Sequence, residues 1–258
     1  MKPTRVVSVE RLDLEAGLAG RAVRTADRDR VVLEAPLQLR ARGTPVATLM
    51  RTPGHDLELI AGLCHAESVP PAICVQVDED AVDLDVDPQA FAGRGLLSSA
   101  ACGVCGRVAI ADLELRAKTV SADTKVAHAV IARLPDTLRA AQQVFEATGG
   151  LHAAGLFTLA GELVCAREDV GRHNAVDKVV GWTRSEPIDP ARHLLFLSGR
   201  LGYELVQKAI MLGVPVVAAV SAPSSLAIEL AERFNVALVG FVRGPRANVY
   251  AHGWRITS

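Results

Sequence analysis

This sequence has almost no net charge and no long apolar run. Both absences exclude whole classes of function. The 28 basic and 29 acidic side chains nearly cancel to a net charge of −1, and no basic stripe is interleaved with aromatic residues, so we expect no binding of nucleic acid through charge. No apolar run reaches the roughly 18 residues of a membrane-spanning helix. The start of the chain, MKPTRVVSVERLDLEAG, lacks the apolar segment of a secretory signal. These absences predict a soluble, cytoplasmic protein that binds no membrane.

Cysteine is also sparse, with 5 residues in the chain. An odd number without an export signal argues against a framework of disulfides. Cys64, Cys74 and Cys165 lie in apolar runs, where we expect them to behave as small buried hydrophobic residues. Cys102 and Cys105 lie in SSAACGVCGR, and each is followed by a glycine. Four explanations remain open for this CxxC pair: a disulfide, a metal clamp, a dithiol redox pair, or a sulfur atom that is handed on.

The first half of the chain suggests a small α+β domain. Residues 1–29 are polar and aperiodic, and we interpret them as a loosely held leader. Residues 30–120 contain two hairpin patterns, and Thr52-Pro53 between them is expected to open a helix. The glycine-rich stretch 87–107, which contains the CxxC pair, is expected to be a loop at the end of this domain. The hairpins are predicted within residues 31–51 and 73–86.

The second half, residues 121–258, is predicted to form an α/β domain. A helical pattern over 124–148 is interrupted at Pro135, and a hairpin follows in 151–169. Short β-branched runs then alternate with amphipathic helices, which is typical of a layered domain with an at least partly parallel sheet. These elements are a helix over 174–184 with Asn174 as N-cap, a strand over 193–199, a helix over 202–213, a strand over 214–222, a helix over 224–234, and strands over 236–243 and 247–252.

Small and basic residues follow three predicted strands. In open α/β sheets, ligands bind beyond the carboxyl ends of strands, where free N–H groups of helix N-termini attract anions. Arginine supplies fork-shaped donors for phosphate, and glycine lets the backbone approach closely. For any one cluster, helix caps and turns are the simpler explanation, whereas the three together favour an anion site. The clusters are Ser198-Gly199-Arg200, Ser221-Ala222-Pro223-Ser224-Ser225 and Arg243-Gly244-Pro245-Arg246.

A second polar cluster, EDVGRHNAVDK at 168–178, follows an apolar strand directly. One explanation is a solvated helix start with surface ion pairs, each worth little. The density of charge favours a pocket of mixed sign, in which a carboxylate could bind the N1/N2 edge of a guanine. His152 precedes another apolar strand, and a structural histidine is the simpler explanation there. The site candidates in this cluster are Glu168, Asp169, Arg172, His173 and Lys178.

Six blocks of the sequence closely resemble the formate dehydrogenase accessory sulfurtransferases, the FdhD family, and they occur in the family's order. A CxxC motif alone would be weak support, whereas six ordered blocks are specific. The blocks are CGVCG at 102–106, TGGLHAAGLF at 148–157, EDVGRHNAVDKVVG at 168–181, SGR with ELVQKA within 198–209, SAPSSLAIELAE at 221–232, and LVGFVRG with NVY within 238–250.

The resemblance implies a relay of sulfur. A cysteine desulfurase would donate sulfane sulfur as a persulfide on Cys102, with Cys105 as its partner. The sulfur would pass to molybdenum in a cofactor with two pyranopterin guanine dinucleotides, bound as substrate before its insertion into formate dehydrogenase, with GDP or GTP as possible analogues. It also implies a homodimer and a second domain like the three-layer cytidine-deaminase fold. The implied cofactor-binding stretch is Phe241, Val242, Arg243, Gly244, Pro245 and Arg246.

The residues are consistent with this role. Gly103 and Gly106 loosen the segment that carries the thiols. The attacking species is a thiolate, so the pKa of Cys102 must fall below about 8.5, and Arg107 is the nearest candidate cation in the sequence. Exchange through Cys105 would release the sulfur or protect the site as a disulfide.

Other functions remain open at this point. A zinc deaminase needs His-x-Glu followed by Pro-Cys-x-x-Cys; His65-Ala66-Glu67 fits the first part, but Ala101 stands where the proline should be. A chaperone that only binds the molybdenum cofactor would use the same strand-end clusters. A thioredoxin-like reductase is disfavoured because the CxxC pair does not open a helix directly after a strand. A purely structural pair is disfavoured by the serines and glycines around it.

Overall fold

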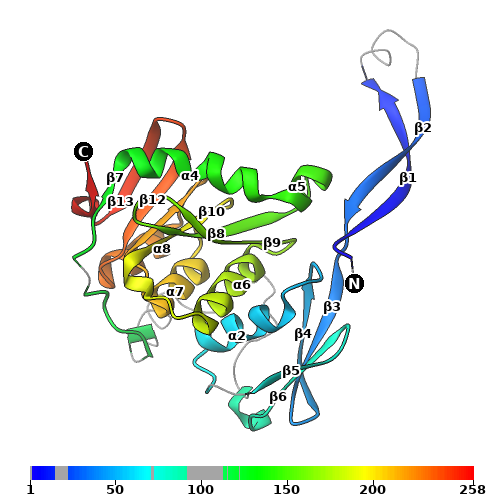
Figure 1. The fold of residues 1–258 in the computed structure, drawn as a ribbon, viewed down its shortest axis with the longest axis horizontal. Coiled ribbons are helices and arrows are strands. Elements are labelled where there is room, and N and C mark those ends of the chain that lie inside the picture. The colour runs from blue at the N-terminus through cyan, green and yellow to red at the C-terminus, as the bar shows by residue number, and fades with distance from the viewer. Residues whose placement is uncertain (1, 15–22, 71–72, 92–112, 115, 122) are drawn as a thin grey trace.

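The protein is represented by a computed structural model, which describes residues 2–14, 23–70, 73–91, 113–114, 116–121 and 123–258 (Figure 1). In the part of the chain that is described, no helix is both long and apolar enough to cross a membrane. Cys102, Cys105 and Arg107 lie outside the described residues.

A six-stranded mixed sheet forms the centre of the larger unit, in the order β13-β12-β11-β10-β8-β9. The central strands β10, β11 and β12 run parallel, whereas β8, β9 and β13 pair antiparallel with their neighbours. This arrangement confirms the partly parallel sheet that the alternating pattern predicts. The strands are β8 (His152–Thr158), β9 (Leu163–Asp169), β10 (His193–Leu197), β11 (Val216–Ala219), β12 (Ala237–Arg243) and β13 (Arg246–Ala251).

Helices cover both faces of this sheet, as Figure 1 shows. Strand β10 illustrates why: Leu195 and Leu197 point into one apolar core, while Leu194 and Phe196 point into the other. A strand that alternates between two cores must be buried on both sides. Helices α6 (Arg172–Ser185), α7 (Tyr203–Leu212) and α8 (Ser225–Arg233) lie on the first face, and α4 (His128–Ala141) with α5 (Gln143–Thr148) on the second.

The smaller unit is a four-stranded sheet in the order β4-β3-β6-β5, with helix α2 (Asp56–Ala66) packed on its apolar face. Its two hairpins confirm the predicted pair, including the acidic turn of the second. Helix α2 begins at Asp56 instead of at Thr52-Pro53, because the backbone first passes through His55 in the left-handed region. The strands are β3 (Ala35–Ala41), β4 (Thr44–Arg51), β5 (Cys74–Asp78) and β6 (Ala81–Leu84).

The two units meet where α2 packs against α6, at a contact made by two glycines. A Cβ atom added to Gly62 would lie 1.9 Å from the carbonyl oxygen of Asp177, and one added to Gly181 would lie 1.9 Å from that of Glu58. Each helix therefore touches the backbone of the other, and no residue with a side chain fits at either position.

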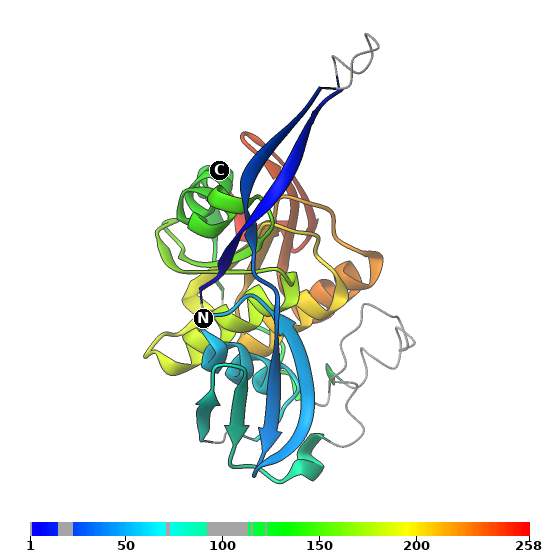
Figure 2. The ribbon, with the colours of Figure 1, turned by 90° about the vertical axis from the view of Figure 1, so that its right-hand side faces the viewer.

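The predicted leader is instead a long hairpin. Strands β1 (Thr4–Asp13) and β2 (Val23–Val32) pair over their whole length and project away from the body (Figures 1 and 2). Opposite charges pair diagonally across it: Arg11 forms an ion pair of 2.5 Å with Asp27, and Arg24 one of 3.2 Å with Glu10. Such cross-strand pairs stabilise an antiparallel ladder without an apolar period. At the base of the hairpin, Val32 lies beside Gly150.

Two helix boundaries also differ from the prediction. Helix α4 continues through Pro135, and the chain leaves the helical conformation at Gln142 before α5 begins. A proline removes one backbone donor but does not always end a helix. Helix α6 begins at Arg172 after an extended Gly171, and Asn174 uses its side chain for contacts outside the helix instead of capping it.

Short elements complete the described chain. They are the 3-10 turns Pro88–Phe91, Pro190–Arg192 and Gly253–Arg255, and the paired strands β7 (Val126–Ala127) and β14 (Ile256–Thr257).

Replacing Gly62 by alanine is expected to lower the free energy of unfolding by about 3 kcal/mol, because the new methyl group must displace backbone instead of a flexible side chain. Gly181→Ala should behave alike. The control is Gly202→Ala, since nothing lies within 4 Å of the Cβ position there. Urea unfolding followed by circular dichroism measures the difference, and a Gly62→Ala protein as stable as Gly202→Ala would contradict this packing.

Candidate functional site

One edge of the six-stranded sheet collects the predicted strand-end clusters. Because β10, β11 and β12 are parallel, their carboxyl ends share this edge, and the segments that start at Ser198, Ser221 and Arg243 all lie there. Antiparallel pairing brings the start of β8 and the end of β9 to the same edge, where His152 is the register partner of Asp169. The topology thus places side by side clusters that are far apart in the sequence.

His152 lies at the centre of this edge. Its neighbour Ala153 donates its N–H to Ser198 Oγ at 2.8 Å and accepts the N–H of Ser198 at 3.0 Å. A Cβ on Gly199 would lie 3.3 Å from His152 Nδ1 and 3.9 Å from the Cβ of Arg172. Burial lowers the pKa of His152, and the positive charges of Arg172, His173 and Arg200 lower it further. Asp169 opposes this effect, but the lower pKa favours the neutral form of the imidazole.

Asp169 and Lys178, which the sequence suggests as members of an open polar pocket, are instead buried against each other, with exposures of 0% and 1%. Lys178 Nζ lies 2.7 Å from Asp169 Oδ2 and donates to the carbonyl of Thr52 at 2.9 Å. The same carboxylate accepts the N–H groups of Thr52 at 3.1 Å and Gly171 at 2.8 Å, and the amide of Asn174 at 2.9 Å. These contacts indicate a structural link between the two units.

Glu168 and Glu58 are likewise occupied by protein groups. Glu168 accepts the backbone N–H groups of Val144 at 3.0 Å and Phe145 at 2.8 Å, and so fixes the start of α5. Glu58 on α2 accepts two hydrogen bonds from Arg167 on β9, at 2.5 and 2.8 Å. Burial acts to raise the pKa of Glu58, but hydrogen bonds from Arg167 and His55 bring it down to about 2. The first pair anchors a helix, and the second joins the two units.

Two ion pairs connect α6 and α7 at successive helical turns. His173 Nε2 lies 2.9 Å from Glu204 Oε2, and this hydrogen bond lowers the pKa of Glu204. One turn further, Lys208 Nζ lies 2.6 Å from Asp177 Oδ1 in the interior, where burial raises the pKa of Asp177 although Lys208 opposes the rise. His173 also lies near enough to His152 to lower the pKa of that imidazole.

The turn between β12 and β13 carries strain and unbalanced charge. Phe241 has a φ of 53°, is 37% exposed as a residue, and donates its N–H to the carbonyl of Ser221 at 3.1 Å. Left-handed backbone at a bulky residue is costly and persists mainly at functional sites. Beyond the buried Val242, Arg243 and Arg246 are cross-strand partners that flank Gly244-Pro245. Like charges placed opposite each other are destabilising, so the pair suits an anionic ligand.

A pocket of about 510 Å³ opens at this edge between the α4–α5 break and the start of β8. It includes His152 and Ser198, which the sequence predicts as site residues. The sequence does not predict Arg139, Gln142 and Phe145 as lining residues, because nothing in their local pattern distinguishes them from other helix positions. The lining is Arg139, Gln142, Phe145, Gly149, Gly150, Leu151, His152 and Ser198.

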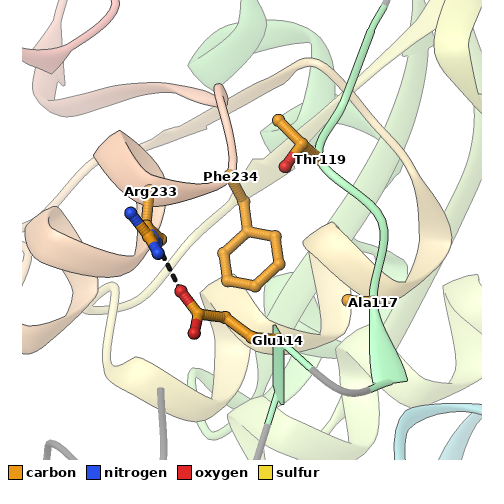
Figure 3. Close-up of a pocket in the computed structure, with 5 residues that line it drawn as sticks. All are labelled: Glu114, Ala117, Thr119, Arg233 and Phe234. Atoms are coloured by element: carbon orange, nitrogen blue, oxygen red, sulfur yellow. Dashed lines mark hydrogen bonds and ion pairs between the residues drawn. The ribbon is translucent and has the colours of Figure 1, made fainter. Parts of the chain in front are cut away.

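A second pocket, of about 330 Å³, lies near the amino end of β12 and includes none of the predicted site residues (Figure 3). Glu114 and Arg233 form an ion pair across its mouth, and the ring of Phe234 lies between them and Thr119. The chain is held there by the N–H of Val120, which donates to the carbonyl of Phe234 at 3.0 Å.

The described cysteines are poorly suited to nucleophilic chemistry. Cys64 and Cys165 are buried, which confirms the prediction for these two residues, and Cys74 is partly buried. Burial raises the pKa of Cys74 to about 11 and that of Cys165 to about 12. Neither of these two thiols is a ready source of thiolate at neutral pH.

The zinc-deaminase alternative gains no support from the described residues. His65 Nε2 lies 2.9 Å from the carbonyl oxygen of Met211, on α7. Within the described ranges, no group of three or more His, Cys, Asp or Glu residues is arranged to hold a metal ion.

Comparison with known proteins identifies the group to which this fold and sequence belong. The FdhD/NarQ family model matches residues 32–257. Proteins named sulfur carrier protein FdhD are similar over most of their length: that of Nocardia farcinica is 45% identical, covering 90% of this chain and 89% of the relative, and that of Sulfolobus acidocaldarius is 43% identical, covering 90% and 93%. The chain therefore belongs to the FdhD/NarQ family.

A solved structure shares the fold. It is a Desulfotalea psychrophila protein described as a formate dehydrogenase accessory protein, with a TM-score of 0.79 over 98% of this chain and 99% of the other. At 21% sequence identity, this match concerns the fold alone. It shows that the mixed α/β architecture with several sheets is not particular to this sequence.

Asp169→Asn should lower the free energy of unfolding by about 3–5 kcal/mol, because it leaves the ammonium group of Lys178 buried without its partner. Asp85→Asn is the matched control, since its ion pair with Arg42 is exposed and should contribute little. Chemical denaturation at pH 7 compares the two variants. Equal stability of both would show that the Asp169–Lys178 pair does not join the units as described.

Proposed function

We propose that this chain is a sulfur carrier that serves formate dehydrogenase. The thiolate of Cys102 attacks the terminal sulfur of a persulfide on a cysteine desulfurase; the donor's S–S bond breaks, a new one forms at Cys102, and the donor leaves as a thiolate. The thiolate of Cys105 then attacks the inner sulfur, which forms a Cys102–Cys105 disulfide and releases the terminal sulfur as sulfide. The two thiols thus supply the two electrons that reduce the sulfur, and a cellular thiol must later reduce the disulfide.

The cysteines of the described chain support this assignment. Cys64 and Cys165 are buried in apolar cores, and the raised pKa of Cys74 disfavours its thiolate. This leaves the CxxC pair as the source of the nucleophile. The relatives that are 43–46% identical to this chain are named sulfur carrier proteins, which supports the same chemistry.

The proposed cargo is a molybdenum cofactor with two pyranopterin guanine dinucleotides, which receives the sulfide at its metal before insertion into formate dehydrogenase. Its phosphates would bind at the strand-end edge. The observation that carries this part is that Arg172, Arg200, Arg243 and Arg246 all lie at the same edge of the sheet, with Arg172 and Arg200 near the His152 imidazole. Guanidinium groups bind phosphate oxygens with paired hydrogen bonds, and a dinucleotide is polyanionic.

Two finer features belong to the same proposal: a relation of the six-stranded layer to the cytidine-deaminase fold, and a homodimeric assembly. A chaperone that binds the cofactor without sulfur chemistry would use the same edge. Only the cysteines separate the two functions, so they are tested first.

Incubation with a cysteine desulfurase and cysteine should add one sulfur atom to the protein, as measured by intact-protein mass spectrometry under non-reducing conditions. Cys102→Ala should abolish this addition, whereas Cys74→Ala, the control, should retain it. Sulfur that still accumulates on the Cys102→Ala protein would exclude Cys102 as the carrier. No addition to the wild type would favour the binding-only chaperone.

GDP, the probe for the nucleotide part of the cargo, should bind the wild type, and the double variant Arg200→Ala/Arg246→Ala should bind it on the order of 10-fold more weakly or worse, because charge-assisted hydrogen bonds to phosphate are lost. Arg42→Ala on the small sheet is the control and should bind normally. Isothermal titration calorimetry at fixed salt measures the affinities. Unchanged affinity in the double variant would remove the anion site from this edge.

A further inference from the structure

We infer that the pocket between the α4–α5 break and β8 binds a planar heteroaromatic ring through a lactam edge, that is, an adjacent ring N–H and C=O, and that the side-chain amide of Gln142 recognises this edge. The inference rests on the proposed function and deepens it, because it places the ring of the cargo at a defined position beside the strand-end cations. Nothing in the motifs of the sequence assigns a role to Gln142.

Gln142 is central because its side-chain amide lines the pocket and forms no hydrogen bond with any described residue. The residue as a whole is 5% exposed. The residue lies where the backbone leaves the helical conformation between α4 and α5, with a ψ of 72°, and its side chain lines the pocket. In the free protein this amide is satisfied by water in the pocket, which a ligand must replace. A ligand that supplies one acceptor and one donor side by side would do so.

A guanidinium group stacked on an aromatic ring forms one wall of the pocket beside Gln142. The guanidinium carbon of Arg139 lies 4.2 Å from the centre of the Phe145 ring, and Arg139 Nη2 donates to Glu146 Oε2 at 2.6 Å. The backbone of Phe145 is fixed in turn by Glu168 on β9. A guanidinium stacked on a ring offers a planar surface, which suits an aromatic ligand.

The other polar groups of the pocket favour a ring with oxo groups over one with only amino substituents. Arg139 can only donate hydrogen bonds. The oxygen of Ser198 already accepts the N–H of Ala153, so its hydroxyl hydrogen is available to a ligand. The pocket is therefore rich in donors, which need acceptors such as carbonyl oxygens. The amide of Gln142 complements the N–H and C=O of a lactam in the same plane.

The position of the pocket fits a ring that carries an anionic group. His152 and Ser198 belong both to the pocket and to the strand-end edge. Gly199 lies against both His152 and Arg172, so the pocket residue His152 and the first of the edge cations border the same glycine. At about 510 Å³, the pocket is within the usual range for a ligand of this size.

Two ring systems share the 2-amino-4-oxo pyrimidine edge that this chemistry selects, guanine and pterin, and the experiment separates them. Binding of GDP and of 6-hydroxymethylpterin is measured by calorimetry on the full chain, with the wild type, Gln142→Leu, Gln142→Glu and Gln143→Leu. Gln143 is the exposed neighbour of Gln142, so the same substitution there is the matched control. ADP, which lacks the lactam, serves as the control ligand.

Gln142→Leu should weaken binding of one of the two probes on the order of 10- to 30-fold, the loss of two hydrogen bonds, while Gln143→Leu binds as the wild type does. The affected probe identifies the ring. Gln142→Glu should recover part of that affinity, because a carboxylate accepts both the lactam N–H and the neighbouring amino group; a role limited to folding would not produce this recovery.

Equal affinity of Gln142→Leu and wild type for both probes would overturn the inference and leave the proposed function intact. A wild type that binds neither probe would overturn the inference together with the cofactor part of the proposed function. ADP binding that depends on Gln142 as strongly as the binding of the other probes would also overturn the assignment of a lactam.

Discussion

The contact between α2 and α6 is the constraint on which the relative position of the two units depends. Gly62 and Gly181 place each helix against the other's backbone, and carbonyl oxygens occupy the space where side chains would otherwise be. The Glu58–Arg167 pair and the hydrogen bonds of Thr52 with Asp169 and Lys178 lie around this contact and join the two units. The close packing opposes sliding of one helix along the other, and the polar contacts that cross the junction oppose rotation. The end of β9 and the start of α6, which border the strand-end edge, are therefore set by the junction of the two units.

Much of the architecture could be predicted because its signals are local. The apolar run HLLFL, flanked by turn residues, predicts a strand buried on both sides, and the structure confirms it as β10. The acidic turn of the second small hairpin fell between β5 and β6, as the alternation indicated. The first 29 residues could not be interpreted in the same way, because charge pairs between distant residues, such as Arg11 and Asp27, stabilise their strands. The predicted start of α6 at Asn174 is wrong for a related reason. The side-chain amide of Asn174 donates to the carbonyl of Met50, which is far away in the sequence.

The strand-end edge was predictable in outline for a topological reason. Parallel strands bring their carboxyl ends together, so Ser198, Ser221 and Arg243 had to lie on one side once the strands were correctly placed. The individual roles were not predictable, since composition alone does not distinguish a polar pocket from a buried ion pair, as Asp169 and Lys178 show. The pocket wall formed by α4 and α5 could not be predicted from the sequence for a different reason. Its shape comes from a break in a helix and from the way Glu168 on another strand holds the segment after the break.

The hairpin formed by β1 and β2 has a consequence beyond its own stability. Its two strands pair only with each other within the described residues, so each has an outer edge with unpaired backbone donors and acceptors. Open edges of this kind invite strands of other molecules to add on, and natural proteins block such addition with charged side chains. The arginines and acidic residues along this ribbon provide that protection: a foreign strand would have to bury them. The polarity that made the segment look unstructured is thus what keeps an exposed ribbon from becoming a template for aggregation.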